Sequence, residues 1–532
     1  MIISRRDFLK NAAIGTAGIA LLGSLPGCSE NTQVPAETTV TKSDVPDVPI
    51  ETLESDIVVV GSGMGGMAAS ISAAEKGAHV ILLEKAGILG GGTNHAEVMF
   101  GYGSRFSKEM GIEYTKFEIL KNEFEFHNYY VDTTLWERIV DVSGDCIDWF
   151  LDKVEPHGGG FFALLGNEGG LKVAHAFKPT QVSTKGLGQI VIMEEIARDL
   201  GVQIYTNYAA KEILMSDGAV SGVLVNTKKG TVQIKCKAVI LATGGYAGNS
   251  EILKAHNRDM SQMAMRGCST CTGDGMAMAH EVGAVERGSS SIQLLGASMH
   301  ESIGLDTHIN QATCNEPFAI WVNQDGVRYM PEGELIFTQA ANAIDMQDAT
   351  YAVFDSAQAK RFTTYKSVAG YGTYILPDTV LDKVESDIKE LLDKKVEFAF
   401  TSDTIEGLAD KMSIPTDAFA KTVSQYNEIC KQGTDVDFGK RSSALNPIST
   451  PPYYGFKLYT NLLCTLGGIR INKNGQALDK NSMPIKGLYA TGCDAGGFTG
   501  DTYGVNLPGS TQALALCLGR LSALHAVGSP IA

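Results

Sequence analysis

A short apolar run followed at once by closely spaced glycines restricts the fold of this chain more than any other feature. Residues 57–60 read IVVV, and residues 61–66 read GSGMGG, which forms the pattern G-x-G-x-x-G. Small residues follow at 67–77, and a second apolar run at 78–83 ends at Glu84. This order predicts a strand, a tight turn, a helix and a second, parallel strand, which is typical of α/β proteins.

The same order predicts a dinucleotide site. Gly61 would make the tight turn, Gly63 would let the backbone approach a pyrophosphate, and Gly66 would let helix and strand pack closely. The start of the helix would face the phosphates, and Glu84 could accept hydrogen bonds from ribose hydroxyls. The pattern alone does not separate FAD from NAD. No second complete copy follows a strand in the sequence, so we expect electrons to arrive from another protein.

Composition limits the other possibilities. A chain of 532 residues with 44% hydrophobic residues predicts two or more domains with a large buried core. The net charge of −16 argues against a nucleic-acid surface. The cysteines after Cys28 are scattered, with one close pair at Cys268 and Cys271, which predicts neither a disulfide framework nor an iron–sulfur cluster. No metal-ligand spacing is present, so no metal site is predicted.

The first 28 residues read as an export signal. Residues 4–10, SRRDFLK, match the twin-arginine pattern, and a weakly apolar stretch follows at 12–25. The sequence LPGC at 25–28 is similar to a lipoprotein cleavage box, which favours lipidation of Cys28 over simple cleavage. Residues 29–53 are expected to form a flexible linker. The mature protein would then be extracytoplasmic, and it would contact the membrane only through a lipid anchor.

Several short motifs together resemble the fumarate reductase and succinate dehydrogenase flavoprotein superfamily. The resemblance is strongest to the branch of flavocytochrome c fumarate reductase, urocanate reductase and 3-ketosteroid dehydrogenase. It covers nearly everything after residue 54. The motifs are LEK at 83–85, GGGT at 90–93, ATGG at 242–245, TGDG at 272–275, VNQDGVRY at 322–329 and GLYATG at 487–492.

The resemblance implies a Rossmann-like FAD-binding domain that is split by an inserted α+β capping domain. The FAD domain would comprise residues 54–296 and 456–532, and the cap would comprise residues 297–455. FAD would be bound non-covalently, and the start of the last helix would stabilise the reduced flavin. The implied FAD-binding residues are Gly61, Gly63, Gly66, Glu84, Lys85, Gly91, Gly92, Thr93, Ala242, Thr243, Gly244, Asp274, Cys493, Asp494, Ser510 and Thr511.

Reduction of an activated C=C bond needs a hydride and a proton. The resemblance puts the proton-donating arginine of the fumarate reductases at Arg328, although this arginine could instead pair with a carboxylate or grip a substrate anion. Glu316 could replace the carboxylate of the family's proton relay. Tyr503 could hydrogen-bond a substrate oxygen, or it could pack under the flavin. Together these residues are the predicted catalytic set.

The substrate side departs from the family pattern at three positions. An expected histidine is missing near Leu295, a second histidine is Cys464, and the arginine that clamps a carboxylate is Leu507. Without a bidentate arginine, specific recognition of a dicarboxylate is lost. A larger, less charged enone or enoate is therefore expected instead of fumarate. The histidines at 95, 300 and 308 are expected to be structural or solvated.

The sequence thus favours an exported reductase of an activated C=C bond that serves anaerobic respiration. Its electron donor would be a separate cytochrome, flavoprotein or quinol-linked protein. One alternative is a dehydrogenase of a 3-ketosteroid-like substrate. Another is a flavin electron carrier without substrate turnover. Arg328 favours the reductase, because that direction needs an acid.

Overall fold

The computed structural model describes residues 49–166, 171–178, 188–258, 260–288, 290–368, 370, 371, 374–529 and 531. The predicted export signal, Cys28 and most of the predicted linker lie outside these residues. Strand β1 (Glu51–Glu54) pairs in parallel with β10 (Gly230–Lys235). The prediction that the linker extends to residue 53 is therefore wrong at its end, because this segment joins the sheet. No helix in the described part of the chain is both long and apolar enough to cross a membrane.

The largest sheet has the strand order β1-β10-β9-β21-β11-β2-β3-β7. Its centre is parallel: β2 (Ile57–Val60) lies between β11 (Ala238–Leu241) and β3 (Val80–Glu84). These three strands are buried along their whole length, as expected for a parallel sheet covered on both faces. On its other side, β3 pairs in parallel with β7 (Gln203–Thr206). From the C-terminal part of the chain, β21 (Pro484–Ala490) pairs with β11.

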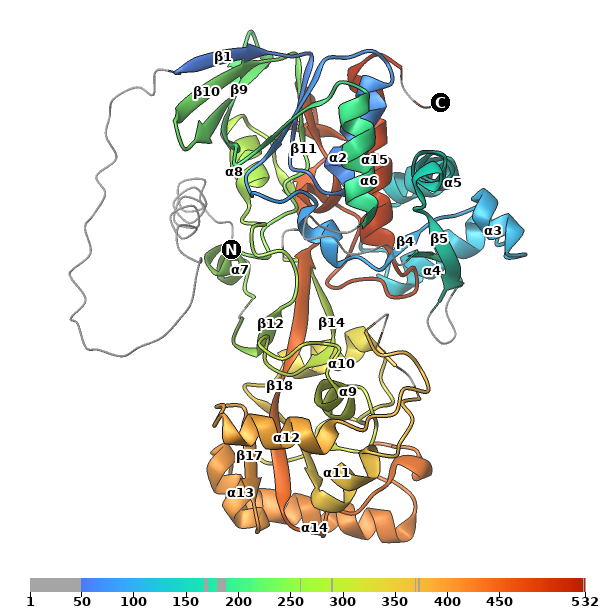
Figure 1. Ribbon diagram of the computed structural model, residues 1–532, viewed down its shortest axis with the longest axis vertical. Helices are drawn as coiled ribbons and strands as arrows, with labels where there is room; N and C mark the ends of the chain where they lie inside the picture. The colour runs from blue at the N-terminus through green and yellow to red at the C-terminus, as the bar shows by residue number, and fades with distance from the viewer. Residues whose placement is uncertain are drawn as a thin grey trace, which may run out of the picture.

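Two helices from opposite ends of the chain cover one face of this sheet. Helix α2 (Met64–Ala74) and helix α15 (Ser510–Ala526) lie side by side (Figure 1). They approach closely, because a Cβ atom on Gly519 would lie 2.3 Å from the carbonyl oxygen of Gly65. Only glycine permits this distance. The contact brings the start of α15 next to the glycine turn.

Further elements surround this sheet and complete the upper body in Figure 1. Two antiparallel strands, β8 and β9, extend it, and β4, β5 and β6 form a small separate sheet. The bounds are β8 (Ala209–Ser216), β9 (Ala219–Thr227), β20 (Gln476–Leu478), β4 (Val98–Phe100), β5 (Phe161–Leu165), β6 (Ala174–Phe177), β13 (Glu286–Arg287), β19 (Gly468–Arg470), β22 (Ala495–Gly496), α3 (Arg105–Glu109), α4 (Lys116–Phe126), α5 (Thr133–Val154), α6 (Gly188–Asp199), α7 (Ser250–Ala255), α8 (Asp274–Glu281), η1 (Gly91–His95), η2 (Glu155–His157), η3 (Met260–Gln262) and η5 (Gly492–Asp494).

A second body lies below the first in Figure 1 and shares one strand with it. Strand β18 (Tyr453–Thr465) begins in the lower body and runs up into the upper one (Figure 1). Its first half pairs with β16 (Thr350–Asp355) and β17 (Ala399–Ser402). Its second half pairs with β12 (Met263–Met265) and β14 (Ile292–Ser298).

The lower body has its own apolar core. Aromatic side chains such as Phe354, Phe362 and Phe456 are fully buried in it. Its other elements are β15 (Ile320–Asn323), α9 (His308–Cys314), α10 (Phe337–Asp345), α11 (Ser356–Phe362), α12 (Val384–Asp393), α13 (Ile405–Met412), α14 (Thr416–Gln432) and η4 (Ser442–Ala444). The predicted α/β fold with a Rossmann-like FAD domain is confirmed. The predicted domain boundaries at 296/297 and 455/456 stay predictions, and each falls inside a continuous strand, β14 or β18.

Candidate active site

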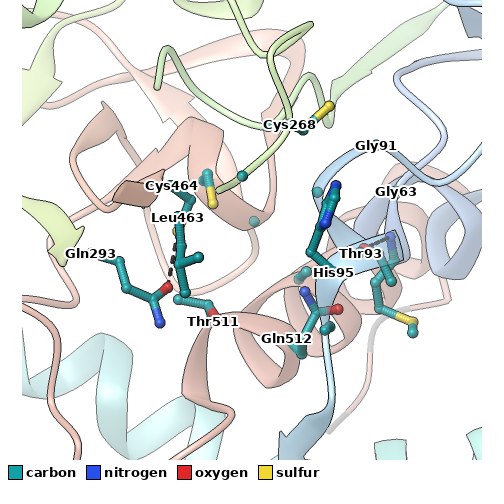
Figure 2. Close-up of a pocket in the computed structure, with 18 of the residues that line it drawn as sticks. Gly63, Gly91, Thr93, His95, Cys268, Gln293, Leu463, Cys464, Thr511 and Gln512 are labelled. Carbon is teal, nitrogen blue, oxygen red and sulfur yellow. Dashed lines mark hydrogen bonds between the residues drawn. The ribbon is translucent and has the colours of Figure 1, made fainter. Parts of the chain in front are cut away.

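A cavity of about 720 Å³ lies where the two bodies meet. Its size is typical of a site for a small molecule or cofactor. The glycine turn, the loop after β3 and the start of α15 line one end. Residues such as Phe337 and Tyr371 line the other end. Figure 2 shows Gly63, Thr93 and His95 on one side of this cavity, with Gln293 and Cys464 on the other.

The glycine turn has the tight geometry that the sequence predicted. Gly61 has φ +103°, and a Cβ atom on it would lie 2.2 Å from the carbonyl oxygen of Ala242. A Cβ atom on Gly66 would lie 1.8 Å from the carbonyl oxygen of Gly61. Gly66 does not line the cavity, and its absent side chain lets α2 pack against β2. The backbone N–H of Met64, at the start of α2, donates to Thr93 Oγ1 at 2.9 Å.

Glu84 lies at the end of β3, buried and pointing to the cavity. Its Oε2 accepts a hydrogen bond from Ser62 Oγ at 2.5 Å, and its Oε1 accepts one from the Ala86 N–H at 2.8 Å. Lys85, the next residue, donates from Nζ to Asp274 Oδ2 at 2.6 Å. The carboxylate of Glu84 is thus held in one orientation with lone pairs left for a ligand hydroxyl.

Asp494 supports the cavity without lining it. Its buried carboxylate accepts hydrogen bonds from Thr243 Oγ1 and the Gly245 N–H, both at 2.9 Å, and burial raises its pKa. It therefore holds the turn after β11 in place. Ser510 is buried and also lies outside the lining, whereas Thr511 lines the cavity. The sequence-based assignment of Asp494 and Ser510 as direct cofactor contacts is thus not supported by this arrangement.

The residues at this end of the cavity fit FAD. A Cβ atom on Gly91 would meet no heavy atom within 4 Å, which leaves room beside the backbone. Gln512 lines the cavity, and its buried Oε1 has no hydrogen-bond partner among the described residues. A buried polar atom of this kind normally has a partner, which a bound ligand would provide. The remaining predicted cofactor residues that line the cavity are Gly63, Gly92, Thr93, Ala242, Thr243, Gly244 and Cys493.

A doubly wound sheet whose glycine turn, acidic residue and helix start open into one cavity defines the class of dinucleotide-binding flavoproteins. The FAD binding domain family matches residues 56–504, and the chain belongs to this family. FAD is therefore its cofactor. When bound and reduced, it supplies the hydride of the reaction.

Relatives indicate the kind of enzyme. The chain is 33% identical to vinyl phenol reductase of Lactiplantibacillus plantarum over 484 residues. The aligned region covers 88% of this chain and 96% of the relative. It is 30% identical to urocanate reductase of Eggerthella lenta, over 84% of this chain and 70% of that protein. A solved structure of a flavocytochrome c3 fumarate reductase in its open conformation has 28% identity and a TM-score of 0.68, covering 90% of this chain and 79% of that one. The chain is thus an FAD-dependent oxidoreductase of the fumarate reductase flavoprotein type, a group that includes reductases of C=C bonds.

Three predicted substrate-side residues line the cavity: Leu295, Cys464 and Tyr503. Cys464 Sγ donates to Gln293 Oε1 at 3.1 Å, the dashed line on the left of Figure 2. The Tyr503 hydroxyl accepts a hydrogen bond from the Gly509 N–H at 2.8 Å, and burial raises the pKa of Tyr503 to about 12. Tyr503 thus remains a protonated phenol at neutral pH, and it also caps the start of α15.

Leu507, the fourth substrate-side position, does not line the cavity. It is fully buried in the main core, and its neighbours Val505 and Pro508 line the cavity instead. The prediction that Leu507 contacts substrate is therefore wrong. The absence of an arginine at this position still leaves that wall of the cavity without a carboxylate clamp.

Arg328, the predicted proton donor, lies in the core of the lower body and is not among the residues that line the cavity. Its guanidinium donates to both oxygens of Glu332 at 2.9 and 2.8 Å, and to Asp435 Oδ2 at 2.9 Å. Burial lowers the pKa of Arg328, but the hydrogen bonds and charges of Glu332 and Asp435 outweigh it and raise the pKa above its ordinary value. The structure therefore contradicts the prediction of a catalytic acid here and supports the alternative, a carboxylate pair.

Glu316 also lies outside the cavity lining. Its buried Oε1 accepts hydrogen bonds from Ser367 Oγ at 2.6 Å and from Gln311 Nε2 at 2.9 Å. Burial raises its pKa. Because Ser367 Oγ also accepts from the Gly370 N–H, Glu316 fixes the backbone that leads to Tyr371. The prediction that it relays protons to substrate is not supported by this geometry.

The predicted histidines separate in space. His95 lines the cavity (Figure 2). His300 stacks on Phe398 with ring centroids 4.9 Å apart, and His308 accepts from the Lys383 N–H at 3.1 Å. These two have structural contacts, as expected. His95 remains available to a bound ligand.

Sequence reasoning missed several residues that line the substrate end, among them Arg266, Phe337, Tyr371 and Tyr374. Arg266 follows the short strand β12 and is separated from the others by more than 70 positions. The two tyrosines stand in a glycine-containing loop, which is a weak signal of a ligand contact by itself. Their common location depends on the packing of the lower body against β18.

Proposed function

We propose that this chain is an exported FAD-dependent reductase that saturates a C=C bond conjugated to a carbonyl or aromatic group. An enone or an aryl enoate is the expected substrate class, and fumarate is not. The observation that carries this proposal is the lining of the substrate end. Its walls are apolar, with Leu295, Phe337, Leu376, Pro377 and Val505.

The charges at this end argue against a dicarboxylate. Among the described residues that line the cavity, the arginine is Arg266, and its N–H groups already donate hydrogen bonds to oxygen atoms of the protein. Nε donates to Asn461 Oδ1 at 3.3 Å, Nη1 to the Glu301 carbonyl at 3.0 Å, and Nη2 to Ser298 Oγ at 2.7 Å. Two carboxylates would enter without bidentate partners, and burying them unpaired is costly. The name of the vinyl phenol reductase supports a C=C bond conjugated to an aromatic group.

The electrons would come from a separate cytochrome, flavoprotein or quinol-linked protein, because the sequence holds one complete dinucleotide pattern. The twin-arginine match at 4–10 and Cys28 support export with lipid attachment. Residues 297–455 would act as a cap that excludes water when substrate is bound. Such an enzyme would serve as the last step of an anaerobic electron-transfer chain.

Anaerobic reoxidation tests this function directly. Protein reduced with dithionite is mixed with 4-phenyl-3-buten-2-one, 4-coumarate or fumarate, and the flavin absorbance band is followed. We expect rapid reoxidation by the aryl alkenes and slow reoxidation by fumarate. Faster reoxidation by fumarate would overturn the substrate class. Bleaching of oxidised protein by a saturated ketone, with no reaction of the alkenes, would favour the dehydrogenase alternative.

Export has its own test. The full-length chain and its Arg5→Lys, Arg6→Lys double variant are produced in a bacterium with a twin-arginine pathway, and cell fractions are assayed for bound FAD. We expect the wild type outside the cytoplasm and the double variant inside it. Equal retention of both proteins in the cytoplasm would overturn the proposed route.

A further inference from the structure

We propose that Tyr371 donates the proton of the alkene reduction, and that Asn461 and Arg266 position its hydroxyl. This inference rests on the proposed function and names the acid that the site lacks once Arg328 is excluded. Tyr371 lies in the lower body and lines the cavity. Asn461 belongs to β18, and Arg266 directly follows β12, the strand that pairs in parallel with β18.

The hydrogen bonds around Asn461 show that the Tyr371 hydroxyl accepts a hydrogen bond, which leaves its proton for donation. Asn461 Oδ1 accepts from Arg266 Nε at 3.3 Å, and a guanidinium can only donate. The amide nitrogen of Asn461 must therefore face the other way, where it donates to the Tyr371 hydroxyl oxygen at 3.0 Å and to the Leu295 carbonyl at 2.7 Å. The Tyr371 oxygen is thus an acceptor in this contact. Its own proton is donated to no other described residue.

The location of Tyr371 suits a proton donor. The Asn461 amide that holds it also holds Leu295, which lines the substrate end together with Cys464. The ring of Phe337 packs edge-on against Tyr371, with centroids 5.7 Å apart. Tyr371 is only 6% exposed, so bulk water does not compete for the donated proton.

The electrostatics suit the chemistry as well. Burial raises the pKa of Tyr371 above its ordinary value, so the hydroxyl stays protonated at neutral pH and gives its proton only to a strong base. Such a base forms in this reaction. When a hydride adds to one alkene carbon, the π bond breaks and its electron pair is left on the other carbon, stabilised by the conjugated group.

The proton step then balances. The O–H bond of Tyr371 breaks, a C–H bond forms at the carbon that holds the electron pair, and a phenolate remains. Asn461 donates to this phenolate, and the positive charge of Arg266 stabilises it. After the product leaves, water that enters the emptied cavity returns a proton to the phenolate before the next turnover. The hydride and the proton together account for the two hydrogens of the saturated product.

A second set of contacts holds the backbone on the other side of Tyr371. The Tyr371 N–H donates to the Ile375 carbonyl at 2.7 Å. Glu316 fixes Ser367 and Gly370, which precede Tyr371. Glu316 is thus a positioning residue for this loop.

The experiment compares Tyr371→Phe with Tyr351→Phe. Tyr351 lies on β16 of the lower body, is as buried as Tyr371 at 8% exposed, and donates its hydroxyl proton to the Met412 carbonyl at 3.0 Å, but it does not line the cavity, so it is the matched control. Three quantities are measured on each protein: FAD content, the Kd of 4-phenyl-2-butanone from the flavin absorbance shift, and the rate of reoxidation by 4-phenyl-3-buten-2-one. We expect Tyr371→Phe to slow reoxidation by about a hundredfold or more, with FAD content and Kd changed by less than about threefold. Tyr351→Phe should stay within about threefold of the wild type in all three.

The other outcomes are decisive. If the wild type is reoxidised by an alkene and Tyr371→Phe is reoxidised equally fast, the assignment of the acid is wrong and the proposed function stands. If it loses FAD or product binding along with the rate, its role is structural, and the assignment is also wrong. If the wild type itself is silent with every alkene, the proposed function fails and this assignment fails with it. Asn461→Ala should lower kcat at an unchanged KM, which marks a positioning role and not substrate binding.

Discussion

Arg328 and Glu332 form a two-pronged ion pair inside the lower body, with Nε–Oε1 and Nη2–Oε2 distances of 2.9 and 2.8 Å. Both side chains are almost fully buried, and the guanidinium also lies 5.0 Å from the centroids of the Tyr426 and Phe438 rings. The pair therefore organises the core of this body. The role of this ion pair is structural, although the family resemblance first suggested that Arg328 is a catalytic acid.

Arg328→Leu should destabilise the protein by about 3–5 kcal/mol, because it leaves the buried Glu332 and Asp435 carboxylates with one partner fewer. Urea unfolding followed by tryptophan fluorescence measures this loss. Lys394→Ala is the control, since its pair with Glu390 is mostly exposed and should contribute less than about 1 kcal/mol. A variant of unchanged stability that binds FAD but no longer reduces an alkene would restore Arg328 as the acid.

Gly61→Ala should abolish FAD binding. The substitution combines a left-handed backbone, φ +103°, with a Cβ atom 2.2 Å from the Ala242 carbonyl oxygen. Gly77→Ala is the matched control, because Gly77 has φ +80° but open space around its Cβ position. The control should cost about 1–2 kcal/mol of stability and retain FAD. FAD content after gel filtration distinguishes the two, and equal retention would contradict the tight turn.

Glu84→Gln should weaken FAD binding by about tenfold to a hundredfold, which corresponds to the loss of about 1.5–3 kcal/mol for hydrogen bonds to a charged group. Both oxygens of Glu84 accept hydrogen bonds from protein donors, so an amide would bring one donor against another. Flavin fluorescence during titration of FAD into the apoprotein measures the Kd. Glu54→Gln, at an exposed pair with Lys235, should leave this Kd unchanged. An unaltered Kd in Glu84→Gln would show that the carboxylate does not serve the cofactor.

Tyr503→Phe should lower stability by about 1–3 kcal/mol, because the Gly509 N–H at the start of α15 loses its acceptor. It should also change the pH dependence. Burial raises the pKa of Tyr503 to about 12, above its ordinary value of 10.0. The stability that this tyrosine contributes is therefore fully present below pH 10 and is lost as the pH rises toward 12. The wild-type advantage over Tyr503→Phe, measured by urea unfolding at several pH values, should shrink across this range; a constant advantage would contradict it.

The order of strand, turn, helix and strand from 57 to 84 could be predicted, although the helix runs from Met64 to Ala74 and the second strand begins at Val80. Every signal for it is local: an apolar run sets a buried strand, Gly61 sets the turn, and Glu84 closes the next strand. The resemblance then extended the prediction to FAD and to most residues of its cradle. It failed at Arg328 and Leu507, because a motif match aligns positions and carries no information about which way a side chain points.

The sequence by itself determined the dinucleotide fold, since this depends on residue type and short spacing, and its resemblance to a known family implied the FAD cofactor and the loss of the carboxylate-clamping residues. Only the tertiary structure decided which side chains meet at the substrate. It brought Arg266, Tyr371 and Asn461 together from three distant segments through the shared strand β18. Such a contact depends on how two bodies pack on one strand, and no local pattern in the chain records that packing.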